Sequence, residues 1–216
     1  MKANMKKERF TQKMKVAYHE AGHAVMCYIE KVKFRYVTII PNEKENFAGA
    51  LLPEKFRDTS NPEYVEDDNI KPLIEKRVLV SFAGGIATYI LTGRHDHRGS
   101  EKDYLMAHNI ATKLCGPNDQ LCQKYLDWLR VRCEDTMIKP VNQYMVEILA
   151  SMLLEHGTIG YFKARKIIIE AEKEFFDTYL MEGTRPNQLM LEQKKRWDNE
   201  IEFMQKQSEQ FNRVAG

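Results

Sequence analysis

The chain has 216 residues, 43% of them hydrophobic and 30% charged, so it is long enough to bury the core of one large domain or two small ones. Its formal net charge is only +2, and its lysines and arginines are dispersed along the sequence. Both features argue against a nucleic-acid-binding protein, because such proteins carry a clustered basic face. The longest uncharged run, Val78 to Gly93, is shorter than the ~20 residues that a helix needs to cross a bilayer, so no membrane span is expected.

The first half of the chain predicts a mixture of helices and strands. After a polar leader over residues 1–10, apolar residues at helical spacing predict a helix from about residue 11 to 31. Two short apolar or β-branched runs, "FRYVTIIP" (34–41) and "FAGALLPE" (47–54), flank the polar turn "NEKEN" and predict a β-hairpin. Two more helices are expected, one over 72–92, opened by Pro72 and closed by Gly93, and one from a Ser100 cap to about Leu114, with the loop "RHDHRG" between them.

The second half predicts helices alone, over 119–134, 140–156, 158–182 and 187–212. The fold class is therefore α+β and predominantly α-helical. We expect a core over residues 11–115 and a helical C-terminal part over 116–216, either as one compact domain or as a domain and a subdomain.

The stretch "VAYHEAGHAV" places His19 and His23 one helical turn apart, with Glu20 beside them. On a helical wheel the histidines lie roughly 160° from the apolar stripe that contains Ala21 and Val25, so they do not share the core face. Two imidazoles at this spacing can both reach one zinc ion at ~2.1 Å, with the glutamate placed to take a proton from water. The alternative is a polar stripe of an amphipathic helix that faces solvent.

A catalytic zinc takes three protein ligands, and one helix cannot supply the third, because Cys27 lies ~12 Å along the axis from His19. The candidates elsewhere are acidic residues on other helices and His95, His97, His108 and His156. Among the acidic residues, Asp103 continues the apolar face of its predicted helix, where a carboxylate needs a partner. It fits a capping box with Ser100 equally well, so the spacing alone leaves both interpretations open.

The order of several motifs resembles the peptidase domain of the FtsH-type membrane AAA+ zinc proteases. The segments that carry the resemblance cover about residues 14–160: "VAYHEAGHAV", "VTIIP", "GALLPE", "FAGGIATYILTG", "HRGSEKDYLMAHNIA" and, more weakly, "ILASMLLEHGTI". The resemblance implies a zincin-like active-site helix with a small β-hairpin and a helical C-terminal part. It also implies that the aspartate of the S-x-x-D segment, Asp103, completes a zinc site with His19 and His23, and that Glu20 is catalytic.

The chain departs from the family pattern in two ways. It carries neither the AAA+ ATPase module nor the membrane anchors, and Thr88 and Tyr89 stand where the family usually has acidic residues. We therefore expect a carboxylate contact that supports the metal site to be lost. Gly84 and Gly85, in the same segment, are expected to be points where helices pack closely.

These observations predict a zinc-dependent metalloendopeptidase that cleaves unfolded or flexible polypeptides. The chain shows no glycine-rich phosphate loop, so hydrolysis is expected to be independent of ATP. The alternatives are a non-catalytic, peptidase-like binding module and a proteolytic subunit served by an AAA+ ATPase in trans, and a homo-oligomer is also left open. The four cysteines form no C-x-x-C pair and no signal peptide is recognisable, which favours reduced thiols and a cytoplasmic protein.

Overall fold

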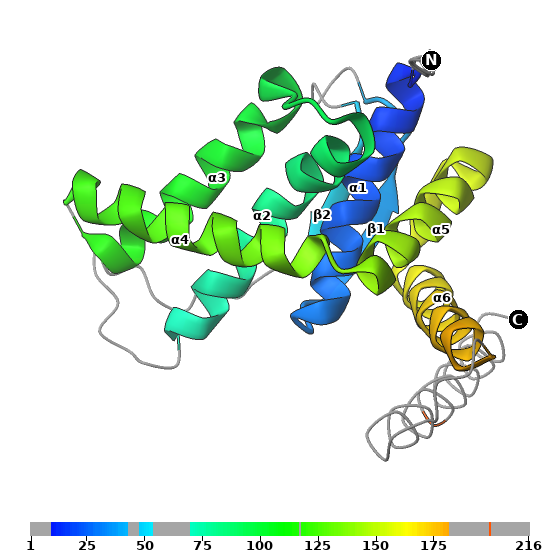
Figure 1. The fold of residues 1–216 in the computed structure, drawn as a ribbon. Coiled ribbons are helices and arrows are strands. Elements are labelled where there is room, and N and C mark those ends of the chain that lie inside the picture. Colours follow the sequence, from blue (N-terminus) through cyan, green and yellow to red (C-terminus); the bar gives the residue numbers. More distant parts are fainter. Residues whose placement is uncertain (1–9, 43–47, 54–69, 117, 182–198, 200–216) are drawn as a thin grey trace, which may run out of the picture.

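The computed structural model describes residues 10–42, 48–53, 70–116, 118–181 and 199 (Figure 1). The fold is α+β and predominantly helical, which confirms the predicted class. In chain order the elements are α1 Gln12–Ile29, β1 Phe34–Thr38, β2 Ala50–Pro53, α2 Ile70–Thr92, α3 His97–Cys115, α4 Asp119–Met137, α5 Pro140–His156, β3 Thr158–Gly160 and α6 Tyr161–Met181. The predicted leader and the predicted helix over 187–212 lie almost wholly outside the described residues.

The three strands form one antiparallel sheet in the order β2-β1-β3. The predicted hairpin is confirmed, with Val37 of β1 opposite Leu51 of β2. The prediction of a helix from residue 158 is wrong over its first three residues, which form β3 and place Ile159 opposite Val37. Gly157 ends α5 with a φ of +75° and turns the chain back towards the sheet, where β1 offers these three residues an edge to pair with.

Helix α1 lies at the centre of the molecule, where it packs against α2, α5 and the sheet (Figure 1). Small side chains allow this close packing, and Ala17, Ala21 and Ala24 are fully buried. A side chain at Gly22 would lie 2.6 Å from Cβ of Ala87, which shows how closely α1 and α2 approach each other.

The burial of α1 corrects the helical-wheel interpretation. The side of α1 opposite the apolar stripe is not a solvent face, because α2 covers it and both Glu20 and His23 are buried. The alternative of a solvent-facing polar stripe is therefore wrong. A polar group that is buried in this way needs partners inside the protein.

Two helices begin earlier than the sequence predicts. Helix α2 begins two residues before Pro72, which sits in the first turn, where its missing N–H costs no hydrogen bond. Helix α3 begins at His97, because the side chain of Asp96 accepts a hydrogen bond from the backbone N–H of Gly99 at 3.0 Å. The prediction that Ser100 caps this helix is therefore wrong, and so is the capping-box interpretation of Asp103.

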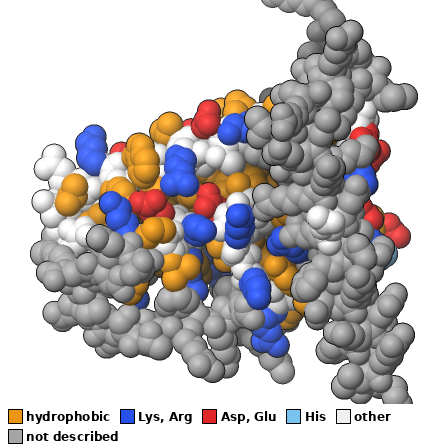
Figure 2. All heavy atoms as spheres, turned by 90° about the horizontal axis from the view of Figure 1, so that it is seen from below, with side chains coloured by type: hydrophobic (Ala, Val, Ile, Leu, Met, Phe, Trp, Pro, Cys, Tyr) orange, Lys and Arg blue, Asp and Glu red, His pale blue; other side chains and the backbone are white. Residues whose placement is uncertain are grey.

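One continuous hydrophobic cluster contains buried residues from α1 through α6, so the helices of the second half pack on the same core as the first. Figure 2 shows the face seen from below, where lysine and arginine side chains stand among hydrophobic ones. Among the described residues, none of the helices combines the length and the apolar character that crossing a membrane requires.

Candidate metal centre

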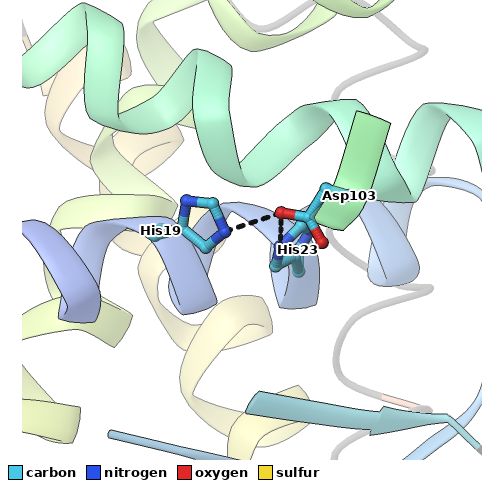
Figure 3. A group of neighbouring side chains, drawn as sticks. All are labelled: His19, His23 and Asp103. Atoms are coloured by element: carbon cyan, nitrogen blue, oxygen red, sulfur yellow. Dashed lines mark hydrogen bonds and ion pairs between the residues drawn. The ribbon is translucent and has the colours of Figure 1, made fainter. Parts of the chain in front are cut away.

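Three side chains that can ligate a metal converge between α1 and α3 (Figure 3). His19 and His23 lie on successive turns of α1, with their rings edge to face and the ring centroids 4.7 Å apart. The Oδ2 atom of Asp103, from α3, lies 2.8 Å from Nε2 of His19 and 3.3 Å from Nε2 of His23. The structure thus brings together the three residues that the sequence analysis proposed as ligands.

The donor set suits a small divalent cation that is bound by nitrogen and oxygen. Bonds of 2.0–2.1 Å around a tetrahedral ion hold their ligand atoms ~3.3 Å apart, and the His23–Asp103 separation of 3.3 Å matches that spacing. The His19–Asp103 separation of 2.8 Å is a hydrogen bond and would have to lengthen by about 0.5 Å. Two imidazoles and a carboxylate fit zinc, and these ligand types also suit other transition metals.

Helix α2 fixes the orientation of the His23 ring. Its Nδ1 lies 2.6 Å from the backbone carbonyl oxygen of Val80, and a carbonyl only accepts hydrogen bonds. Nδ1 therefore carries the hydrogen and donates it, while Nε2 is turned towards Asp103. Metal-ligating histidines are commonly held in this way by a backbone carbonyl or a carboxylate.

Because Gly84 of α2 has no side chain, the rings of both histidines can lie close to the α2 backbone. An added Cβ at this position would lie 2.5 Å from Nε2 of His23 and 2.8 Å from Nε2 of His19, closer than any ordinary contact. The next residue, Gly85, faces elsewhere, since its added Cβ would meet the hydroxyl of Ser100. Both glycines are close packing points, as predicted, but the sequence gives no sign that Gly84 packs against the histidine pair.

The charges of the group shift the pKa values within it. Burial alone would lower the pKa of His23, but the charge and hydrogen bond of Asp103, with smaller contributions from Glu20 and the Val80 carbonyl, raise it to about 9. Burial would raise the pKa of Asp103, but the charges and hydrogen bonds of the two histidines outweigh it and hold that pKa well below its usual range. The site therefore favours a positive charge beside the carboxylate, which either a proton or a metal ion can supply.

Glu20 is buried next to this group and lines the same open cleft of about 480 Å³. Burial raises the pKa of its carboxyl group, the charge of Asp103 adds to this, and the two histidines act in the opposite direction. Gly49, the residue before β2, approaches from the other side, because an added Cβ at Gly49 would lie 2.8 Å from Oε1 of Glu20. The cleft therefore has the histidines and Asp103 on one wall and the edge of the sheet on another.

Three of the other histidines considered as ligands, His95, His108 and His156, lie outside this group. Among the described residues, His19, His23 and Asp103 are the one set of three whose ligand atoms converge. His95 stacks on Tyr89, with ring centroids 4.2 Å apart. His108 lies within α3 and His156 at the end of α5, while His97 begins α3 and its side chain lies outside the described part of the chain.

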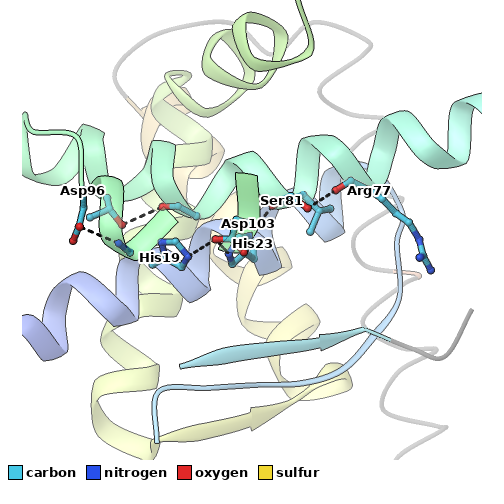
Figure 4. A network of polar contacts seen from close by, with 10 residues as sticks. His19, His23, Arg77, Ser81, Asp96 and Asp103 are labelled. Atoms are coloured by element: carbon cyan, nitrogen blue, oxygen red, sulfur yellow. Dashed lines mark hydrogen bonds and ion pairs between the residues drawn. The ribbon is translucent and has the colours of Figure 1, made fainter. Parts of the chain in front are cut away.

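Thr88 and Tyr89 stand at the positions where the sequence analysis expected a supporting carboxylate contact to be lost. The hydroxyl of buried Thr88 donates a hydrogen bond to the carbonyl oxygen of Gly84 at 3.0 Å, within the same helix. Figure 4 shows the polar network along α2, in which the Ser81 hydroxyl donates to the backbone carbonyl of Arg77 and Asp96 lies at the opposite end. The backbone carbonyl of Val80, rather than a carboxylate, holds His23.

A comparison with models of known protein families finds no match for this chain, and a comparison with curated proteins finds none either. The arrangement of the residues in the cleft must therefore carry the argument about function.

Proposed function

We propose that this protein is a zinc-dependent metallopeptidase that hydrolyses peptide bonds in unfolded or flexible polypeptides. The observation that carries the proposal is the convergence of two imidazole nitrogens and one carboxylate oxygen beside a buried glutamate in an open cleft. The family resemblance of the sequence motifs supports the same reaction. Three protein ligands leave a coordination position free, as catalytic zinc sites do and purely structural sites do not.

His19, His23 and Asp103 would hold the ion, and a bound zinc supplies a Lewis acid that polarises a carbonyl group and makes water more acidic. Glu20 is the general base in this proposal. It takes a proton from the attacking water and returns it to the amine that leaves. Its position directly after His19 on α1 keeps it beside the ligands while its side chain borders the cleft.

Strand β2 gives the cleft a means of aligning a substrate. It is an edge strand of the sheet, and Ala50 and Leu51 line the cleft. An extended peptide could add to such an edge through backbone hydrogen bonds, which depend little on the peptide's side chains. This mode of binding requires an unfolded substrate, because a folded protein does not offer a free extended segment.

The proposal includes no energy-dependent step within this chain. Peptides and unfolded chains need no mechanical unfolding, so access to the cleft alone limits their hydrolysis. Folded substrates would require an AAA+ ATPase acting in trans, and co-purification with such a partner would distinguish that arrangement from independent action. The same purification would reveal a homo-oligomer.

The proposal is tested by metal analysis combined with hydrolysis of casein or a fluorogenic peptide. We expect one zinc per chain and activity that a chelator removes and zinc restores. The Glu20→Gln variant should keep zinc and the fold but lose hydrolysis by about 10²- to 10⁴-fold, because the general base is gone while the ligands remain. Fully zinc-loaded wild-type protein that binds unfolded chains without cutting them would show that the binding-module alternative is correct.

A further inference from the structure

The described residues that line the cleft carry an excess of positive charge. Four of them are basic, and they come from α1, the segment before β1, α2 and α3, in that order: Lys15, Lys33, Arg77 and Lys102. Three are acidic: Glu20, Asp96 and Asp103.

Each of the three acidic residues already has a role inside the protein. Asp103 lies between the two histidines, Glu20 is buried, and Asp96 accepts the hydrogen bond that caps α3. By contrast, Lys15 and Lys33 form no ion pair within the described part of the chain. Their charge is therefore directed towards whatever enters the cleft.

The basic residues lie towards both ends of the cleft. Along α1, Lys15 is one turn before His19 and Cys27 is one turn after His23, so one face of the helix lines the cleft from Lys15 to Cys27. That distance is ~18 Å along the helix axis, which matches five or six residues of an extended peptide at ~3.3 Å each. Beyond Cys27 the lining continues with Lys33.

Figure 4 shows Asp96 and Arg77 at opposite ends of a row, with His19, His23 and Asp103 between them. The end with Arg77 and Lys33 has no acidic residue among the described lining residues. The histidines and Asp103, where a bond would be cut, thus lie between the end that holds Asp96 and the end where Lys33 adds a positive charge with no acidic residue among the described lining residues.

We propose that the cleft selects polypeptide segments with acidic side chains within about three residues of the bond that is cut. The inference rests on the proposed function and specifies its substrate class. Positive charge at the ends of a partly enclosed cleft attracts acidic side chains and disfavours basic ones, while the apolar lining from β2 accepts the residues between them.

The test is a set of peptides that share one neutral sequence and carry a single glutamate or lysine at each position in turn. We expect glutamate to raise kcat/KM about 3-fold or more over the neutral peptide, lysine to lower it, and the difference to shrink as salt is raised. The largest effect should occur at positions on the side of Lys33. Equal cleavage of all the peptides would overturn the inference and leave the proposed function intact.

Variants test whether the basic residues that line the cleft cause the preference for acidic peptides. Lys33→Glu should abolish or reverse the preference for glutamate, whereas Lys163→Glu, an equal change on an exposed residue of α6 outside the cleft, should leave it unchanged. Peptide binding to zinc-loaded Glu20→Gln protein is measured in parallel by fluorescence anisotropy. Preferential binding of acidic peptides without any hydrolysis by the wild type would refute the peptidase and retain the charge selectivity. The inference fails if Lys33→Glu and Lys163→Glu behave alike.

Discussion

Replacing Gly84 by alanine adds a single methyl group at the point where it conflicts most directly with metal binding. The new Cβ would start 2.5 Å from Nε2 of His23, and ordinary contact begins at 3.4 Å, so one of the two must move by about 0.9 Å. Metal–ligand bonds keep within ~0.2 Å of their ordinary lengths, so a histidine that moves away from the new methyl group no longer fits the same ion position. We expect the zinc affinity to fall by about 10- to 100-fold.

The cost to folding should be much smaller than the cost to metal binding. Overpacking of a well-packed interior costs about 1–3 kcal/mol. The better helix propensity of alanine returns about 1 kcal/mol of that. The Gly84→Ala protein should therefore fold, with a free energy of unfolding at most about 2 kcal/mol lower when metal-free forms are compared.

The assay is zinc titration of metal-free protein by calorimetry, with metal content after dialysis and circular dichroism as checks. Gly85→Ala is the matched control, because its added Cβ would meet the Oγ of Ser100, a small hydroxyl that can rotate away from the metal site. A folded Gly84→Ala protein that binds zinc as tightly as Gly85→Ala would refute the reasoning and show that metal binding does not need a glycine at position 84.

Three further predictions follow from the geometry. Asp103→Ala should lose zinc, whereas His95→Ala should keep it, because the His95 ring stacks on Tyr89. Full zinc occupancy in Asp103→Ala would mean that another residue is the third ligand. ATP should leave the rate of fluorogenic-peptide hydrolysis unchanged while a chelator abolishes it, and stimulation of the pure protein by ATP would reveal a nucleotide site. Gly157→Ala should lower the free energy of unfolding in urea by about 1–2 kcal/mol, because its φ of +75° is unfavourable for alanine; an unchanged transition midpoint would contradict this.

The sequence predicts most clearly what depends on local spacing. The i, i+4 spacing of His19 and His23 defines their shared face whatever packs around the helix. The hairpin of β1 and β2 follows in the same way from two apolar runs with a polar turn between them. Asp103 could be proposed from its place on an apolar helix face, but from spacing alone the role with Ser100 had equal weight, and only the family resemblance favoured the metal-binding role.

Other features depend on tertiary contacts that spacing does not encode. Strand β3 has three residues, too few for an alternating pattern, and it exists because β1 offers it an edge. The histidine side of α1 looked polar on a helical wheel, and α2 buries it through the close approach at Gly22. Gly84 and Gly85 are equivalent in the sequence, and only the rotation of α2 about its axis decides which of them faces the histidines.

The position of α5 limits how short a fragment of this protein can be if it is to keep the metal group on a buried helix. Helix α5 covers the side of α1 away from α2, with Leu149, Ala150 and Leu153 fully buried in the cluster that includes Ala17 and other residues of α1. A fragment that stops after α3 would retain every side chain of the metal group, yet it would leave that side of the histidine-bearing helix open to water. The shortest fragment that keeps this helix covered therefore extends through α5, although the three side chains that converge in the described part of the chain end with Asp103.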